Sequence, residues 1–215
     1  MKVDLIDFMG NDLRVANAAR VSFAKESSYE DDIHGWYLKD ADEKLIHYLA
    51  KHGHWSPFSH CFLTFRIKAP IFVARQLQKH QVGLAWNEVS RRYVDSEPEF
   101  YVPHGWRKRA ENVKQGSSDE CVYPHNSAYS NALRAAESAY AMMIRDGVCP
   151  EQARMVLPQS MMTEWYWSGS LYAFSRVCKL RLDSHAQRET QEVAKGIAST
   201  CKHKFPVSWA ALLSN

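Results

Sequence analysis

The stretch "HCFLTFRIKAPIFVARQLQKHQVGLAWNEVSRRY", residues 60–93, changes its pattern twice along its length. Its first part is aromatic and β-branched and alternates from Phe62 to Ile67, which predicts a strand. Pro70 suits the first turn of a helix, so we predict a helix over residues 70–81. The last part gathers amide, carboxylate, hydroxyl and guanidinium groups behind Gly83. That density of polar side chains exceeds what a core or a surface needs, and it indicates a binding site.

The same patterns predict the elements on either side of this stretch. Residues 2–8 and 162–170 are predicted strands, and loops are predicted at residues 25–37 and 94–124. A loop as long as the second one is usually functional or mobile. Predicted helices cover residues 11–23, 38–53, 126–147, 151–157, 171–181 and 186–205. The mixture predicts an α+β protein with a single domain over residues 1–215, in which helices pack on a mixed or antiparallel sheet.

The composition is typical of a soluble globular protein. Of the 215 residues, 46% are hydrophobic and 24% are charged, and the net charge of +3 is too small to argue for a nucleic-acid-binding protein. The sequence contains no run of about 20 apolar residues, which is the length needed to cross a membrane. The start "MKVDLIDFMGND" alternates apolar and acidic residues, unlike a signal peptide. We therefore expect a cytoplasmic protein with no nucleic-acid or membrane partner.

The cysteines and histidines do not suggest a metal site or a disulfide framework. The five cysteines are an odd number and include no Cys-x-x-Cys pair, which favours a reducing compartment. Cys178 and Cys201 fall in predicted helices and are expected in the core. His52, His54 and His60 are not spaced like ligands on one helix face, so no metal is predicted.

The segment from residue 68 to residue 93 is locally basic. It contains five cationic residues and one acidic residue, Glu88, so its net charge is 5 − 1 = +4 within a nearly neutral chain. Such a segment could hold an anion, most simply a phosphate, or it could be an ordinary solvated face. The five cations are Lys68, Arg75, Lys79, Arg91 and Arg92.

The motif "NEVSRRY" favours the binding interpretation. In an extended backbone alternate side chains share one side, so Glu88, Ser90 and Arg92 are predicted to point together. An acceptor, a hydroxyl and a fork-shaped donor on one wall would suit a phosphorylated sugar.

Two later segments also carry isolated polar chemistry. In "ARMVLP" the solitary Arg154 needs either an anion or a salt bridge to a neighbouring helix. In "KLRLDSHAQ" Arg181 and His185 crowd a helix junction, where Asp183 or Ser184 could simply cap the next helix. No Gly-x-Gly-x-x-Gly follows a strand, and neither a Walker loop nor a Gly-x-Ser-x-Gly elbow occurs. The residues alone thus predict an anionic small-molecule site assembled from distant segments.

Several segments together resemble the flavin-dependent thymidylate synthases. The central signature of that family is Arg-His-Arg, seven residues, then Ser, and the matching text here is "RQLQKHQVGLAWNEVSRRY". The resemblance continues in family order over about residues 1–190 and so covers most of the chain. Its other segments are "AARVSF", "HGHWSPFSH", "IKAPIFVARQ", "ARMVLPQS" and "LRLDSHAQ".

This resemblance implies the family's fold and a specific reaction. The family uses FAD to convert dUMP to dTMP, with methylenetetrahydrofolate as the one-carbon donor and NADPH as the reductant of the flavin. No enzyme cysteine attacks the uracil ring, which agrees with the unremarkable cysteines of this chain. The family is a homotetramer whose active sites lie between subunits, and this arrangement would explain why the polar clusters are scattered along the sequence.

The resemblance also implies roles for individual residues. Arg181 matches the arginine placed against the uracil ring, where a fixed charge favours ionisation at N3, and Arg92 and Arg154 would hold the phosphate. The implied dUMP positions are Gln76, Leu77, Gln78, Lys79, Glu88, Val89, Ser90, Arg91, Arg92, Arg154 and Arg181. The implied FAD positions are Ser22, Ser56, Lys79, His80, Gln81, Asn87, Glu88, Ser170, Tyr172, Arg176 and His185.

The sequence departs from the family signature around "KHQ". Lys79 keeps a positive charge, whereas Gln81 loses one, and we hypothesise that Arg176 supplies the missing charge. Nine residues separate His80 from Ser90, one more than in the signature, which predicts a bulge or loop at Gly83.

Two alternatives to dTMP synthesis remain open from the sequence. One is a related enzyme that makes a modified pyrimidine nucleotide, such as 5-hydroxymethyl-dUMP, or that acts on dCMP. The other is a non-catalytic nucleotide- or nucleic-acid-binding module that uses the basic segment together with Trp86 and Tyr93.

Overall fold

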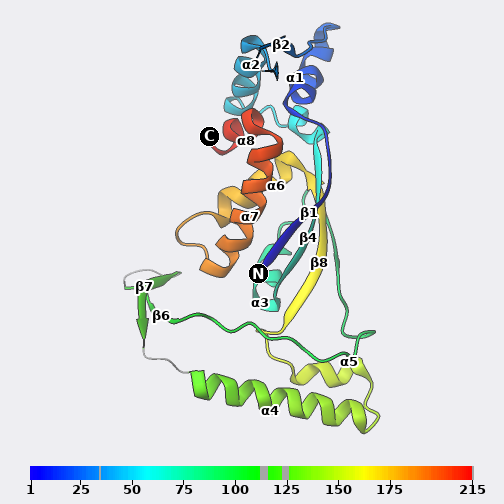
Figure 1. The fold of residues 1–215 in the computed structure, drawn as a ribbon, viewed down its shortest axis with the longest axis vertical. Coiled ribbons are helices and arrows are strands. Elements are labelled where there is room, and N and C mark those ends of the chain that lie inside the picture. Colours follow the sequence, from blue (N-terminus) through cyan, green and yellow to red (C-terminus); the bar gives the residue numbers. More distant parts are fainter. Residues whose placement is uncertain (34, 112–115, 123–125, 215) are drawn as a thin grey trace.

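A four-stranded antiparallel sheet with the strand order β1-β4-β8-β5 forms the centre of the fold (Figure 1). The computed structural model describes residues 1–33, 35–111, 116–122 and 126–214. The sheet strands are β1 (Lys2–Met9), β4 (Phe62–Pro70), β5 (Leu84–Glu88) and β8 (Met162–Ser170). The α+β class and the antiparallel sheet are confirmed, and so are the predicted strands at residues 2–8, 60–69 and 162–170.

The register of β4 and β8 separates a buried face of the sheet from an open one. Phe65 pairs with Trp167 and Ile67 with Trp165, and all four side chains are buried. Their neighbours along the strands point the other way, where Arg66 forms an ion pair with Glu164. One face therefore carries the core, and the other carries polar pairs.

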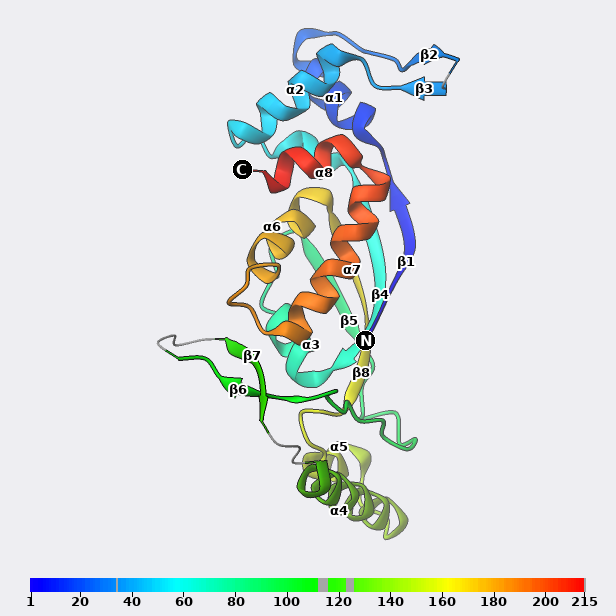
Figure 2. The ribbon, with the colours of Figure 1, turned by 60° about the vertical axis from the view of Figure 1, so that its left-hand side comes forward.

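The helices lie mainly on the buried face and at the ends of the sheet (Figure 2). Helices α3, α6 and α7 contact the strands directly, and α8 packs against α2, α6 and α7. The helices are α1 (Asp12–Arg20), α2 (Asp40–Lys51), α3 (Ile71–Leu77), α4 (Asn126–Arg145), α5 (Pro150–Ala153), α6 (Leu171–Arg181), α7 (Arg188–Lys204) and α8 (Pro206–Leu213). The 3-10 turns are η1 (Val21–Phe23), η2 (Ser56–His60) and η3 (Arg154–Val156).

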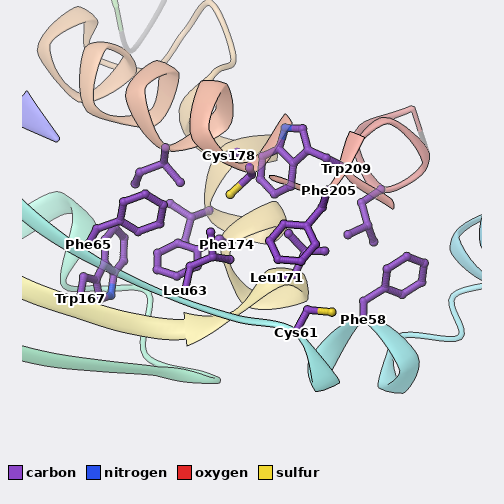
Figure 3. Packing of buried hydrophobic residues seen from close by; sticks show 14 of the residues in the cluster. Phe58, Cys61, Leu63, Phe65, Trp167, Leu171, Phe174, Cys178, Phe205 and Trp209 are labelled. Atoms are coloured by element: carbon purple, nitrogen blue, oxygen red, sulfur yellow. The ribbon is translucent and has the colours of Figure 1, made fainter. Parts of the chain in front are cut away.

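Aromatic side chains fill the space between the sheet and these helices (Figure 3). The ring of Phe174 on α6 meets Phe65 and Trp167 edge-on, with ring centroids 5.1 Å and 5.4 Å apart. Cys178 and Cys201 are buried in this core as predicted, and burial raises the pKa of the Cys178 thiol to about 12. A thiol held protonated in this way is a packing residue rather than a nucleophile.

A carboxylate near the beginning of the chain ties α1 to α8. Asp12 is buried, and its two oxygens accept hydrogen bonds from the backbone N–H groups of Val207 (3.0 Å) and Ser208 (2.9 Å). These donors belong to the first turn of α8 and have no partner inside that helix. Asp12 therefore acts as the cap of a helix that begins almost two hundred residues later.

We expect Asp12→Ala to lower the free energy of unfolding by about 1–2 kcal/mol, because it removes this cap and leaves backbone donors unpaired. Denaturant unfolding followed by circular dichroism measures the change. Asp40→Ala is the matched control, since Asp40 is an exposed aspartate in the first turn of α2, and it should change the value by less than about 0.5 kcal/mol. Equal losses in the two variants would contradict the capping role.

Two predicted loops contain short strands, so those predictions are wrong in part. Residues 25–37 include β2 (Glu30–Asp32) and β3 (Gly35–Tyr37), and residues 94–124 include β6 (Trp106–Arg109) and β7 (Ser117–Val122). Both pairs form two-stranded antiparallel hairpins. Strand β2 is acidic and β7 begins with two serines and an aspartate, residue types with low strand propensity, so pairing with β3 and β6 determines their structure. Residues 112–115 and 123–125 of the second loop lie outside the described residues, and its predicted mobility stays a prediction.

Several predicted helices end at different residues. The helix expected over residues 70–81 stops at Leu77, and the one expected over residues 11–23 stops at Arg20 and continues as η1. The helix expected over residues 151–157 divides into α5 and η3. The last predicted helix ends as expected, but Pro206 starts α8, which the sequence analysis missed. Over the described residues, no helix has both the length and the apolar character needed to cross a bilayer.

Candidate active site

A cavity of about 1020 Å³ opens beside α3, the end of β5 and the turn η3. Segments far apart in the sequence form its walls: α3 and the residues after it, residues 88–92, and residues 154–163. The predicted dUMP positions that line it are Gln78, Lys79, Glu88, Val89, Ser90, Arg91, Arg92 and Arg154. The cavity thus brings together the basic segment and the solitary arginine of "ARMVLP".

The charges around the cavity are strongly unbalanced. Five cationic side chains line it against the single carboxylate of Glu88. Four of them were predicted dUMP positions. The fifth, Arg75, belongs to the basic segment but was not assigned to the site. The cations are Arg75, Lys79, Arg91, Arg92 and Arg154. A cavity with this excess of positive charge favours an anionic ligand.

Three of the arginines are held differently, and this determines which of them can bind an anion. The Nη1 and Nη2 atoms of Arg91 donate to backbone carbonyls of residues 96 and 97. In contrast, Arg92 and Arg154 donate only through Nε, to Ser90 Oγ (3.3 Å) and to the carbonyl oxygen of Glu151 (3.2 Å). Across the described ranges their Nη atoms have no hydrogen-bond acceptor. The free forks of Arg92 and Arg154 can therefore hold a phosphate in two-point fashion.

Glu88 is oriented by two neighbours. Its Oε1 accepts a hydrogen bond from Thr163 Oγ1 (2.7 Å) on β8, and its Oε2 accepts one from Trp86 Nε1 (3.2 Å). A carboxylate has further lone pairs, so Glu88 can still accept a hydrogen bond from a ligand hydroxyl or N–H group. Thr163 was missed by the sequence analysis, because only the pairing of β5 with β8 brings it beside Glu88.

Glu88, Ser90 and Arg92 do line one wall, but the predicted extended backbone is not the reason. Strand β5 ends at Glu88, and the chain then turns, with the N–H of Tyr93 donating to the carbonyl of Ser90 at 3.0 Å. Val89 and Arg91, which alternation would place on the other side, line the cavity as well. The turn after the strand brings these side chains together.

A second polar cluster forms where α6 meets the end of α3. Arg181 Nε donates to His80 Nε2 at 2.9 Å, and Arg181 Nη2 donates to the carbonyl oxygen of Gln76 at 3.2 Å. Arg181 is half-buried, and burial lowers the pKa of its guanidinium from the ordinary value. Arg181 thus meets two other predicted site residues that lie more than a hundred positions before it.

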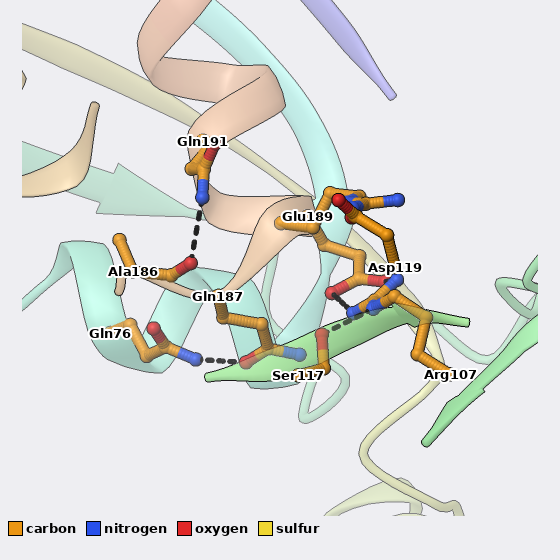
Figure 4. A network of polar contacts seen from close by, with 9 residues as sticks. Gln76, Arg107, Ser117, Asp119, Ala186, Gln187, Glu189 and Gln191 are labelled. Atoms are coloured by element: carbon orange, nitrogen blue, oxygen red, sulfur yellow. Dashed lines mark hydrogen bonds and ion pairs between the residues drawn. The ribbon is translucent and has the colours of Figure 1, made fainter. Parts of the chain in front are cut away.

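Polar contacts extend from this cluster to the start of α7 (Figure 4). The Gln76 side chain donates to Gln187 Oε1 and accepts from Thr190 Oγ1 (3.1 Å). Beside them the buried Glu189 receives two hydrogen bonds from Arg107 of β6, at 2.8 Å and 3.0 Å. The hairpin of β6 and β7 is therefore fastened to the same helix start that supports Gln76. No local sequence pattern indicates these contacts, because their partners lie 82 to 114 positions apart.

Some of the predicted FAD positions lie where η2 meets the start of α6. Tyr172 lies near Trp55, which precedes Ser56, with ring centroids 6.0 Å apart. Gly83 has a φ of +78°, which favours glycine, and a Cβ there would lie 3.2 Å from Ala173 Cβ and 3.8 Å from Ser170 Oγ. The extra residue in the signature is thus absorbed in the turn before β5, without a bulge in the β5–β8 pairing.

Other predicted positions lie apart from the cavity in this single chain. Leu77 is fully buried in the core, and Ser170 Oγ caps α6 by accepting from the Ala173 N–H at 3.1 Å. His185 is exposed, and its Nδ1 lies 2.9 Å from Asp183 Oδ1. The hydrogen bond from the His185 N–H lowers the pKa of the Asp183 carboxyl. Ser22, Ser56, Asn87 and Arg176 are exposed and do not line the cavity.

A family model and individual related sequences both identify the family of this chain. The family model described as "Thymidylate synthase complementing protein" matches residues 4–207. A flavin-dependent thymidylate synthase of Thermosipho africanus is 37% identical over 97% of this chain and 89% of that protein. Another, of Thermus thermophilus, is 39% identical over 97% of this chain and 74% of that protein.

A solved structure agrees with these matches. The UMP/dUMP methylase PolB of Streptomyces cacaoi, bound with 5-Br dUMP, has a TM-score of 0.82 at 31% identity, covering 99% of this chain and 94% of that chain. The same enzyme bound with 5-Br UMP has a TM-score of 0.84. With its cationic cavity, its Arg181 cluster and this similarity over nearly its whole length, the chain is an enzyme that belongs to the flavin-dependent thymidylate synthase family.

Proposed function

We propose that this protein converts dUMP to dTMP, with FAD as cofactor, methylenetetrahydrofolate as the one-carbon donor and NADPH as the reductant. One observation carries the proposal. The guanidinium groups of Arg92 and Arg154, each bonded only through Nε within the described residues, line the same cavity as Glu88. Family membership supports the reaction type, and the dUMP analogue bound to PolB supports the choice of nucleotide.

In this proposal the chain's own residues bind and orient the nucleotide. Arg92 and Arg154 hold the phosphate, while Glu88, fixed by Thr163, accepts a hydrogen bond from the nucleoside. Arg181 supplies a fixed positive charge to the uracil ring and favours its ionised form. Bound flavin supplies the reductive chemistry, which no side chain can provide.

The residues beside the cavity fit a flavin dinucleotide. Lys79 has no ion-pair partner within the part of the chain that the structure describes, so it is available to a pyrophosphate group. Trp55 is 54% exposed and its ring is tilted by 36° against that of Tyr172, which gives an apolar aromatic surface beside Ser56. The hypothesis that Arg176 replaces the charge lost at Gln81 remains a prediction, supported by the electrostatic effect of Arg176 on His80, the residue before Gln81.

We also propose a homotetramer in which subunits share each active site. Ser22 and Ser56, both matched to FAD positions, stand beside large apolar side chains that are exposed in the single chain. Phe23, next to Ser22, is 76% exposed, and Trp55, next to Ser56, is 54% exposed. Burial of such residues against another subunit would complete the site and remove apolar surface from water. The five free cysteines support a cytoplasmic location.

The purified protein should be yellow and should form dTMP from dUMP, methylenetetrahydrofolate and NADPH. Absorbance spectra with and without dUMP and mass spectrometry of the product test this expectation. A 5-hydroxymethyl product, or turnover of dCMP alone, would replace the proposal by the first alternative. UMP is a useful further substrate, because PolB is described as a UMP/dUMP methylase.

A colourless protein that binds nucleotides without turnover would support the non-catalytic alternative instead. One observation already disfavours that alternative. The ring of Trp86 stacks on Trp165 with centroids 4.4 Å apart, so it is not free to stack on a base.

A further inference from the structure

We propose that His80 positions Arg181, and that it does so only as a neutral imidazole that accepts a hydrogen bond at Nε2. The inference rests on the proposed function in one respect, because Arg181 is taken as the group that acts on the uracil ring. It adds a role for His80 that is separate from any contact with the cofactor.

The direction of the hydrogen bond follows from the chemistry of the two side chains. Arg181 Nε lies 2.9 Å from His80 Nε2, and a guanidinium has five N–H donors and no acceptor. His80 must therefore be the acceptor, so Nε2 carries no proton. The single proton of the neutral ring then resides on Nδ1.

A second nitrogen of the guanidinium is fixed as well. Arg181 Nη2 donates to the carbonyl oxygen of Gln76, and the Gln76 side chain is held by Gln187 and Thr190. Within the described part of the chain, Nη1 of Arg181 has no hydrogen-bond partner. Two contacts thus set the plane of the guanidinium and leave one nitrogen for a ligand. A planar fork held in this way is pre-organised, which a free arginine side chain is not.

The surroundings of His80 favour its neutral form. Burial, then Arg181 and then Arg176 lower the pKa of His80 below its ordinary value. Both arginines belong to α6, and on its own segment the neighbouring cation is Lys79. Protonation of His80 would therefore add a positive charge beside positive charges. Because the folded-state pKa is lowered, the hydrogen bond is present above about pH 6.5 and is lost as pH falls through the lowered value.

The tautomer can be observed directly, without any assay of turnover. In protein labelled with 15N-histidine and loaded with FAD, one histidine should show a protonated Nδ1 and a bare Nε2 at pH 7.5. His80→Gln should remove that signal, and Arg181→Met should abolish its preference for the Nδ1 proton. A His80 with its proton on Nε2, or one unaffected by Arg181→Met, would overturn the proposal.

A matched pair of variants tests the functional consequence. In His80→Gln the side-chain carbonyl can still accept from Arg181, and it cannot be protonated, whereas His80→Leu has similar bulk and no acceptor. We expect His80→Leu to lower kcat for dTMP formation about 100-fold, with a much smaller change in the KM for dUMP. The kcat of His80→Gln should be at least about tenfold higher than that of His80→Leu, because one neutral hydrogen bond contributes about this factor.

The pH profile separates positioning from a merely structural role. Wild-type kcat should fall on the acid side as His80 becomes protonated, and this limb should be absent in His80→Gln. FAD content, measured by absorbance in each variant, shows whether cofactor binding has changed. An unchanged acid limb in His80→Gln would contradict the proposal. If the wild type forms no dTMP at any pH, the proposed function fails, while the 15N signals still decide whether His80 holds Arg181.

Discussion

Arg181→Met is expected to lower kcat for dUMP methylation by about 10²–10³-fold while leaving FAD bound. The variant keeps the length and apolar stem of the side chain but loses the positive charge that stabilises an anion on the ring. It also frees His80 Nε2 and the carbonyl of Gln76, its two present partners. Steady-state kinetics with dUMP as the varied substrate measures the loss, and absorbance at saturating FAD measures cofactor binding.

Arg181→Lys should lie between the wild type and the methionine variant. An ammonium keeps the charge, but it is not a planar fork that can donate to His80 and Gln76 in fixed directions. Arg145→Met on α4 is the matched control, since Arg145 is 74% exposed and pairs with Asp146, which is also exposed. A methionine variant with full activity would remove Arg181 from the catalytic machinery.

Arg107→Met is expected to lower the free energy of unfolding by about 3 kcal/mol at pH 7, because it leaves the buried carboxylate of Glu189 without its partner. Burial raises the pKa of Glu189, but the hydrogen bonds and charge of Arg107, together with hydrogen bonds from the Glu189 backbone and the Gln187 side chain, outweigh it and keep the pKa below its usual value. A lowered pKa stabilises the fold above about pH 4.3, and this contribution is lost as pH falls further. In the variant burial is no longer offset by Arg107, so its deficit should shrink as acid protonates Glu189.

Lys108→Met is the control for this prediction. Lys108 is the next residue of β6 and pairs with Glu120, but both side chains are more than half exposed, so its loss should cost less than about 0.5 kcal/mol. Denaturant unfolding at pH 5 and pH 7 compares the two variants. Equal effects of the two substitutions, or a deficit of Arg107→Met that grows as pH falls, would show that Glu189 is not a buried charge held by Arg107.

Elements with a strong periodic pattern were predictable from the sequence. Strands β4 and β8 were predicted correctly because each has one buried face, so that aromatic and β-branched residues alternate along the sequence. The hairpins β2–β3 and β6–β7 were missed, since their strands have only three to six residues and β2 and β7 have little strand propensity. Helix α8 was missed because no element was predicted beyond residue 205, although Pro206 suits the first turn of a new helix.

The candidate site was predictable in its residues and much less so in its geometry. The basic segment and Arg154 could be recognised from their chemistry, and resemblance to a family connected them with Arg181. The partners that fix them could not be found in this way. Thr163 reaches Glu88 through strand pairing, and Glu189 reaches Arg107 across 82 positions, so neither contact leaves a local pattern.

The carboxylate of Asp12 also has a consequence for the order in which the protein matures during translation. Its partners at residues 207 and 208 leave the ribosome long after Asp12 itself. Until then α1 has no docked α8, and Asp12 remains hydrated beside an incomplete core. The nascent chain can complete its sheet once β8 has been synthesised, but it completes the junction between its first and last helices only when residues 206–213 have followed.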